Sequence, residues 1–209
     1  MSLKIAIVGL PNVGKSTLFN SLTRSRGADA QNYPFCTIEP NVGIVEVPDE
    51  RLTKLSGISK SEKVIPTAIE FVDIAGLVKG ASKGEGLGNQ FLSHIRETDV
   101  IVYVLRAFQS ETISHVYERV DPAADLDIVQ SELILKDIET LEKKLAEMKR
   151  RSKSGVDKEA IMLDGLLTRV LEFINQGKPV VEMSLTEEEQ EILYEFWLLT
   201  NKKRVYVLN

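Results

Sequence analysis

Apolar residues in this sequence gather in short runs that alternate with segments of helical spacing. Five runs have the length and the branched or aromatic composition of buried strands, and they cover residues 3–8, 43–47, 68–73, 99–105 and 204–208. Helical spacing is found at residues 15–24, 51–55 and 89–97. Strands that alternate with helices predict an α/β domain, in which helices on both faces of a mostly parallel sheet make three layers.

A different pattern lies between the last two predicted strands. From Asp125 to Met148 apolar residues recur at alternating steps of four and three, at Ile134, Ile138, Leu141, Leu145 and Met148. This spacing is typical of a coiled-coil seam. A second seam follows a polar tip and consists of Leu163, Leu166, Leu167, Val170 and Ile174. We therefore predict an inserted α-helical coiled-coil hairpin at residues 125–200, with the sheet domain formed by 1–124 and 201–209.

A helix start signal lies between this hairpin and the last predicted strand. Thr186 and Glu189 have the spacing of a capping box. We expect the helix that they open to bring Tyr194, Phe196 and Trp197 back to the core.

The most informative motif directly follows the first predicted strand. Residues 9–17, GLPNVGKST, fit the phosphate-binding pattern G-x-x-x-x-G-K-[ST]. Gly9 and Gly14 allow the backbone to turn its N–H groups inward, where they and the helix N-terminus hold a polyphosphate. We expect nucleotide contacts from Asn12, Val13, Gly14, Lys15, Ser16 and Thr17. The alternative is an ordinary glycine-rich turn between a strand and a helix.

Two of these side chains have specific predicted roles. Lys15 is expected to bridge the β- and γ-phosphates, and Ser16 to place its hydroxyl on a magnesium ion.

A second motif ends the third predicted strand. The segment from Asp73 to Gly76 fits D-x-x-G, and an acid at the carboxyl end of a strand lies where open sheets bind ligands. After a phosphate loop, Asp73 is the expected outer-shell magnesium ligand and the Gly76 N–H a donor to the γ-phosphate. A helix-capping or turn aspartate is the alternative. The glycines at 76–88 indicate either a segment ordered by the γ-phosphate or a flexible linker.

Composition and charge narrow the class of protein. The 209 residues carry a net charge of −5, so any RNA contact has to come from local basic clusters such as residues 149–153, which otherwise form a solvated hairpin end. The single cysteine, Cys36, excludes an internal disulfide and suits a reducing compartment. No apolar segment of 18 residues occurs. We expect a cytoplasmic protein without membrane or sequence-specific DNA partners.

Together these motifs resemble the YchF family of Obg-like ATPases, a branch of the Obg-related P-loop GTPases. The resemblance rests on residues 9–17, 32–41 and 71–88, and it extends over all 209 residues. It implies a Ras-like P-loop domain that binds ATP with Mg²⁺, binds GTP less well, and hydrolyses the γ-phosphate slowly as a ribosome-associated switch. It also implies that family members continue beyond residue 209, completing the nucleotide domain and adding a small TGS domain.

The resemblance assigns further site residues. Thr37 is implied to be the switch threonine that reaches magnesium and the γ-phosphate, with a loop threonine as the alternative. Asn12 corresponds to an asparagine that helps to hold K⁺ beside the phosphates, or it is a loop asparagine without that role. Asn209 is the first residue of the N-x-x-E pattern that goes with ATP, whereas guanine-specific relatives have N-K-x-D. Because only this asparagine is present, the preference for ATP rests on the resemblance.

Leu77 replaces the water-orienting glutamine of Ras-like enzymes. Because leucine neither donates nor accepts a hydrogen bond, another group has to position the water, and slow hydrolysis is expected. His115, on a predicted loop near the nucleotide, is the candidate, with an ordinary exposed loop histidine as the alternative. His94 is expected on a helix surface.

Three other functions fit parts of the sequence. The first is a guanine-specific Obg-type GTPase. The second is a phosphotransferase, since kinases use the same loop. The third is a ribosome- or RNA-binding module in which the nucleotide is a structural ligand.

Overall fold

The computed structural model describes residues 2–24, 42–74, 87–152 and 158–209. Its strands are β1 (Leu3–Val8), β2 (Val42–Glu46), β3 (Ala68–Asp73), β4 (Val100–Leu105) and β5 (Lys203–Leu208). Its helices are α1 (Lys15–Arg24), α2 (Glu50–Ser59), α3 (Leu87–Arg96), α4 (Pro122–Ser152), α5 (Lys158–Ile174) and α6 (Glu187–Tyr194), with 3-10 helices η2 (Val180–Glu182) and η3 (Leu199–Asn201). The five predicted strands are confirmed to within one residue at each end.

Helix α2 is longer than the predicted residues 51–55. The Asp49 side chain caps its start by accepting a hydrogen bond from the Arg51 N–H, and Lys60 ends it in the left-handed region with a φ of 48°. These local caps, which the apolar spacing does not report, set its length.

The five strands form one sheet in the order β2-β3-β1-β4-β5. Only β2 runs antiparallel to its neighbour, so the carboxyl ends of the other four strands meet at one edge. The mostly parallel sheet is therefore confirmed, and the residues at the ends of β1, β3, β4 and β5 come together there.

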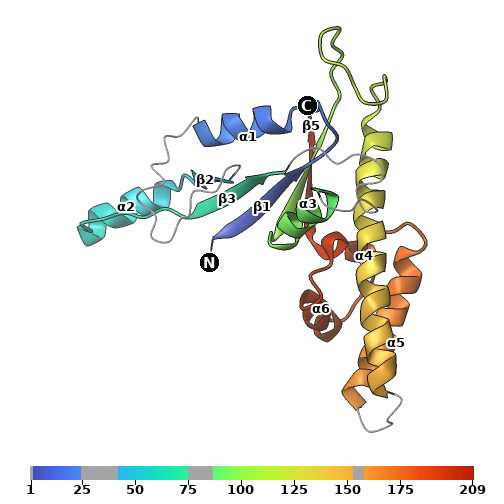
Figure 1. Ribbon diagram of the computed structural model, residues 1–209. Coiled ribbons are helices and arrows are strands. Elements are labelled where there is room, and N and C mark those ends of the chain that lie inside the picture. The colour runs from blue at the N-terminus through green and yellow to red at the C-terminus, as the bar shows by residue number, and fades with distance from the viewer. Residues whose placement is uncertain (1, 25–41, 75–86, 153–157) are drawn as a thin grey trace.

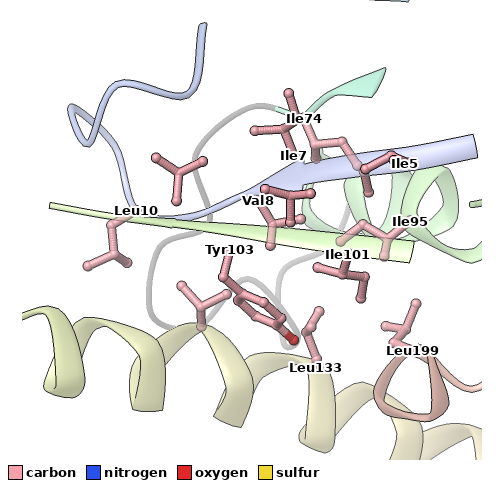
Figure 2. Packing of buried hydrophobic residues seen from close by; sticks show 14 of the residues in the cluster. Ile5, Ile7, Val8, Leu10, Ile74, Ile95, Ile101, Tyr103, Leu133 and Leu199 are labelled. Atoms are coloured by element: carbon pink, nitrogen blue, oxygen red, sulfur yellow. The ribbon is translucent and has the colours of Figure 1, made fainter. Parts of the chain in front are cut away.

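Helices cover both faces of this sheet. Helix α1 lies so close to β2 that a Cβ at Gly43 would be 2.1 Å from the Thr23 side chain, and the register places Gly43 on the same face as Ile5. Val8, three residues beyond Ile5, points to the other face. There its partner across the register, Tyr103, packs toward α4 (Figure 2).

Helices α4 and α5 lie side by side and extend away from the sheet (Figure 1). Their shared core contains positions of both predicted seams: Ile134, Leu141, Leu145, Met148, Leu166, Leu167, Val170 and Ile174. The earlier turns of α4 behave differently, because Val129 and Leu133 belong to the core of the sheet. Helix α4 thus joins two cores, and the division at residue 125 remains a prediction.

The capping box of α6 is confirmed, but the fate of its aromatic residues is only partly as predicted. Thr186 Oγ1 accepts from the Glu189 N–H at 3.2 Å, and Glu189 Oε2 accepts from the Thr186 N–H at 3.0 Å. Tyr194 is 68% exposed and Trp197 50% exposed. Phe196 is partly buried against the helical core, as predicted. The other buried residues of this stretch are leucines, at Leu193, Leu198 and Leu199, and Trp197 lies in a left-handed turn with a φ of 52°.

Within the described part of the chain, no helix has the length and apolar character needed to cross a membrane.

Candidate functional site

The phosphate loop leaves β1 at the edge where the parallel strands end. A Cβ at Gly9 would lie 2.4 Å from the Val104 carbonyl oxygen, and one at Gly14 only 2.2 Å from the Asn209 side chain. Gly14 and Asn12 also have positive φ angles, 99° and 62°. The loop therefore depends on both glycines, because their neighbours leave no room for a side chain.

Lys15 is bound to its own loop. Its Nζ donates to the Leu10 carbonyl at 2.7 Å, and the residue is only 6% exposed. Burial lowers the pKa of Lys15 to about 8, while the negative charge of Asp73 acts in the opposite direction. The ammonium group thus lies within a loop whose carbonyl it would exchange for phosphate oxygens.

Ser16 and Asp73 occupy places that suit a magnesium ion. Ser16 is exposed in the first turn of α1. Asp73 ends β3 beside Ile7 of β1, and its Oδ1 is buried without a hydrogen-bond partner among the described residues. In the described ranges no group of three or more His, Cys, Asp or Glu could hold a metal. A hard cation that keeps its waters and binds phosphates needs no such group, so the donor set fits Mg²⁺.

Asn209 closes the site from the end of β5. Its Nδ2 donates to the Val13 carbonyl at 2.9 Å, and its backbone is held between Leu105 and Ala107. A residue 196 positions away along the chain thus contacts the phosphate loop directly.

The segment after β4 also lies against the loop. Asn12 Nδ2 donates to the Ser114 carbonyl at 3.2 Å, and Arg106 Nη2 donates to the Ile113 carbonyl at 2.7 Å. Arg106, only 2% exposed, was not among the predicted site residues. The one sequence signal for it is a charged residue directly after an apolar strand.

Asn12 of the phosphate loop bonds to the carbonyl of Ser114, the residue before His115, so His115 lies on a loop near the nucleotide site, as predicted. The His115 ring is buried, however. Its side chain is 3% exposed, and its Nε2 lies 2.8 Å from Asp125 Oδ2. Its Nδ1 accepts from the Tyr117 N–H at 3.2 Å, which places the proton of a neutral ring on Nε2. Both nitrogens are occupied, so in this structure neither orients a water. The alternative of an ordinary exposed loop histidine is wrong, because Asp125 of α4 meets the ring. His94 is exposed on α3, as predicted.

Several predicted residues lie outside the described ranges. They are Thr37, Gly76, Leu77 and Cys36. The basic tip is described in part, and its residues Lys149 and Arg150 are exposed at the end of α4.

A cavity of 790 Å³ lies at the opposite edge of the sheet. Residues near the amino ends of β1, β4 and β5 line it, together with α6 and Trp197. The six-residue strands separate it from Lys15 by about 20 Å.

Comparison with known proteins agrees with this geometry. The family described as 50S ribosome-binding GTPase matches residues 4–154. The "Ribosome-binding ATPase YchF" of Bacillus subtilis is 52% identical over 209 residues and that of Escherichia coli O157:H7 47%; the chain is matched in full and spans 57% of the length of each relative. The solved "YchF GTPase" of Schizosaccharomyces pombe superposes with a TM-score of 0.82 at 39% identity, over 100% of this chain and 56% of that one. The chain therefore belongs to the 50S ribosome-binding GTPase family, and its predicted resemblance to the YchF proteins is confirmed.

Proposed function

We propose that this chain is the nucleotide-binding part of a magnesium-dependent triphosphatase, which binds ATP and slowly hydrolyses its γ-phosphate as a ribosome-associated switch. The observation that carries the proposal is the convergence of Lys15, Asp73 and Asn209 from three different strand ends on one loop. The names of the relatives support ATP and the ribosome as ligands.

Each group in the site has a proposed role. Nucleotide binding is assigned to Asn12, Val13, Gly14, Lys15, Ser16, Thr17 and Asn209, and magnesium to Ser16, Thr37 and Asp73. When bound, the ion neutralises charge on the β- and γ-phosphate oxygens. Asn12 donates through its amide nitrogen to Ser114, and its amide oxygen would be the atom that binds K⁺.

Hydrolysis of the γ-phosphate in this proposal is slow because Leu77 stands at the position of the glutamine that orients the attacking water in Ras-like enzymes. The Gly76 N–H would donate to the γ-phosphate, and Leu77 would supply no hydrogen bond to the attacking water. The buried pair of His115 and Asp125 holds the segment after β4 instead.

The choice of base has two candidates. The curated relatives are named ATPases, whereas the solved Schizosaccharomyces pombe relative is titled a GTPase. We propose ATP, with GTP bound less well, and keep the guanine-specific GTPase as the second candidate.

The helical part is the proposed contact with the ribosome. We propose that residues 125–200 form a coiled-coil insertion whose basic tip, residues 149–153, faces ribosomal RNA. A cytoplasmic location follows, because the ribosome is found there.

A phosphotransferase is disfavoured by the position of the cavity. An acceptor bound there would lie at the wrong edge of the sheet, about 20 Å from Lys15. Release of phosphate in the absence of any acceptor would exclude this alternative.

The test is calorimetric titration with magnesium-bound analogues of ATP and GTP that cannot be hydrolysed. We expect ATP to bind more tightly and Lys15→Ala to weaken binding by at least about a hundredfold, since the ammonium-phosphate contact is lost. Lys203→Ala, an exposed lysine at the amino end of β5, is the matched control and should bind as the wild type does. Tighter binding of GTP would establish the guanine-specific alternative.

Binding to ribosomes separates the switch from a passive module. The switch requires ATP- and ADP-bound forms to differ in co-sedimentation with ribosomes. Equal co-sedimentation of both forms and of Lys15→Ala would favour the module with a structural nucleotide.

A further inference from the structure

Arg106 is among the largest fully buried side chains of the described residues, and the phosphate loop lies directly against it. It follows β4 at the edge where the nucleotide site is built, with only 2% of its surface exposed.

The partners of its guanidinium group are carbonyl oxygens and a ring. Nη2 donates to Ile113 at 2.7 Å, Nε to Phe108 at 3.2 Å and Nη1 to Asn12 at 3.5 Å. The Phe108 ring centroid lies 4.3 Å from Cζ. Across the described ranges no carboxylate forms a salt bridge with Arg106.

Such a cation is unusual in a protein interior. Buried arginines are normally paired with an acid, because desolvating a charge is costly. Carbonyl oxygens accept one hydrogen bond from each of the three nitrogens of Arg106, but among the described residues no acid balances the net positive charge. A polyphosphate on the other side of the loop would supply the missing negative charge.

The contact with Asn12 also has an orienting effect. In a trans peptide the C=O and the following N–H point in opposite directions, and no peptide of the described chain is cis. Arg106 behind the Asn12 carbonyl therefore favours an outward Val13 N–H. Asn209 orients the next peptide in the same way. It donates to the Val13 carbonyl, so the Gly14 N–H points toward the nucleotide side.

We propose that Arg106 is a positioning residue of the phosphate site: from beneath the loop it orients the Asn12 peptide, and its unbalanced charge favours polyphosphates. This inference rests on the proposed function. It assigns no contact between Arg106 and the nucleotide itself.

The test compares affinities for magnesium-bound ATP analogue, ADP and AMP in Arg106→Gln and Arg106→Lys. Glutamine keeps donors without the charge, and we expect it to weaken ATP binding at least about tenfold, ADP binding less and AMP binding least. Lysine keeps the charge and should retain tighter ATP binding than glutamine. Arg96→Met, which removes an arginine bonded to Thr140 away from the loop, is the control and should bind normally.

Thermal unfolding establishes that each variant is folded at the titration temperature. If Arg106→Gln does not fold, Arg106→Met replaces it, because it fills similar volume without a polar group to bury. ATP affinity within twofold of the wild type, or an equal loss for ATP, ADP and AMP, would overturn the inference. If the wild type and Arg96→Met bind no nucleotide, the proposed function fails and the inference falls with it.

Discussion

Two aspartates at opposite edges of the sheet are buried in opposite ways. At the carboxyl ends of the strands, Oδ1 of Asp73 has no hydrogen-bond partner within the part of the chain that the structure describes. Near the amino end of β5, Asp137 of α4 accepts from the Leu199 N–H at 2.8 Å and from the N–H and hydroxyl of Thr200 at 2.7 Å each. Burial raises the pKa of Asp137 to about 6, although these hydrogen bonds favour its charged form.

Two lysines repeat the contrast. Lys15 donates to one carbonyl of its own loop, whereas Lys202 donates to the carbonyls of both Arg96 and Thr98 and lies 5.8 Å from the Trp197 ring. Burial lowers the pKa of both lysines. A shifted pKa therefore does not distinguish the two edges. The completeness of hydrogen bonding does distinguish them. At the carboxyl ends of the strands, incompletely bonded groups are available to a ligand, whereas at the amino ends complete bonding holds the helices in place.

The largest expected effect is a loss of stability at the amino ends of the strands, around Asp137, which we call the fastening edge. Asp137→Ala leaves three buried donors unsatisfied and should lower the free energy of unfolding by about 3 kcal/mol. Urea unfolding measures this loss. Asp127→Ala, an exposed aspartate of the same helix, is the control and should change stability by less than about 0.5 kcal/mol. If the folded Asp137→Ala protein also loses nucleotide affinity at low temperature, the two edges do not have the separate roles in stability and in binding that we describe.

At the carboxyl ends of the strands, where the nucleotide site lies, a substitution should raise stability. Lys15→Met removes a buried ammonium group and should raise the free energy of unfolding without nucleotide by about 1 kcal/mol. The wild-type lysine has a folded pKa of about 8, below its ordinary value of 10.5, so wild-type stability rises with pH between these values. The gain from methionine should therefore shrink above about pH 8. A variant less stable than the wild type at pH 7 would contradict this expectation.

An exposed cap near the fastening edge should matter less. Thr186→Ala removes the capping oxygen of α6 and should cost about 1 kcal/mol, because Glu189 loses one of the paired hydrogen bonds. Thr186→Ser keeps the oxygen and should be nearly neutral in the same unfolding measurement. A loss as large as that of Asp137→Ala would mean that burial does not set the difference between these sites.

The smallest expected effect is the uptake of protons when nucleotide binds. At pH 8 about half of the Lys15 side chains are neutral in the free protein, and bound phosphates should return them to the charged form. Nucleotide binding at pH 8 should thus take up as much as about half a proton, measured by calorimetry in buffers of different ionisation enthalpy. The uptake should vanish at pH 6.5. No proton uptake at pH 8 would contradict the lowered pKa of the free lysine.

Local patterns in the sequence were enough for the elements and for the phosphate loop. Strand limits, the seams of α4 and α5, the capping box and residues 9–17 all depend on neighbours within a few positions, so apolar spacing and residue type report them directly. The same holds for the position of Asp73 at the end of β3.

Partners of buried polar groups were decided only by the tertiary structure. The loop position of His115 was predicted, but its buried partner, Asp125 in the first turn of α4, was not. The buried Arg106 likewise meets Asn12, which is far away along the chain. Asp137 meets Thr200 across 63 residues. Periodicity shows which face of an element is buried, but the group that meets a buried charge comes from a distant part of the chain, and only packing brings the two together.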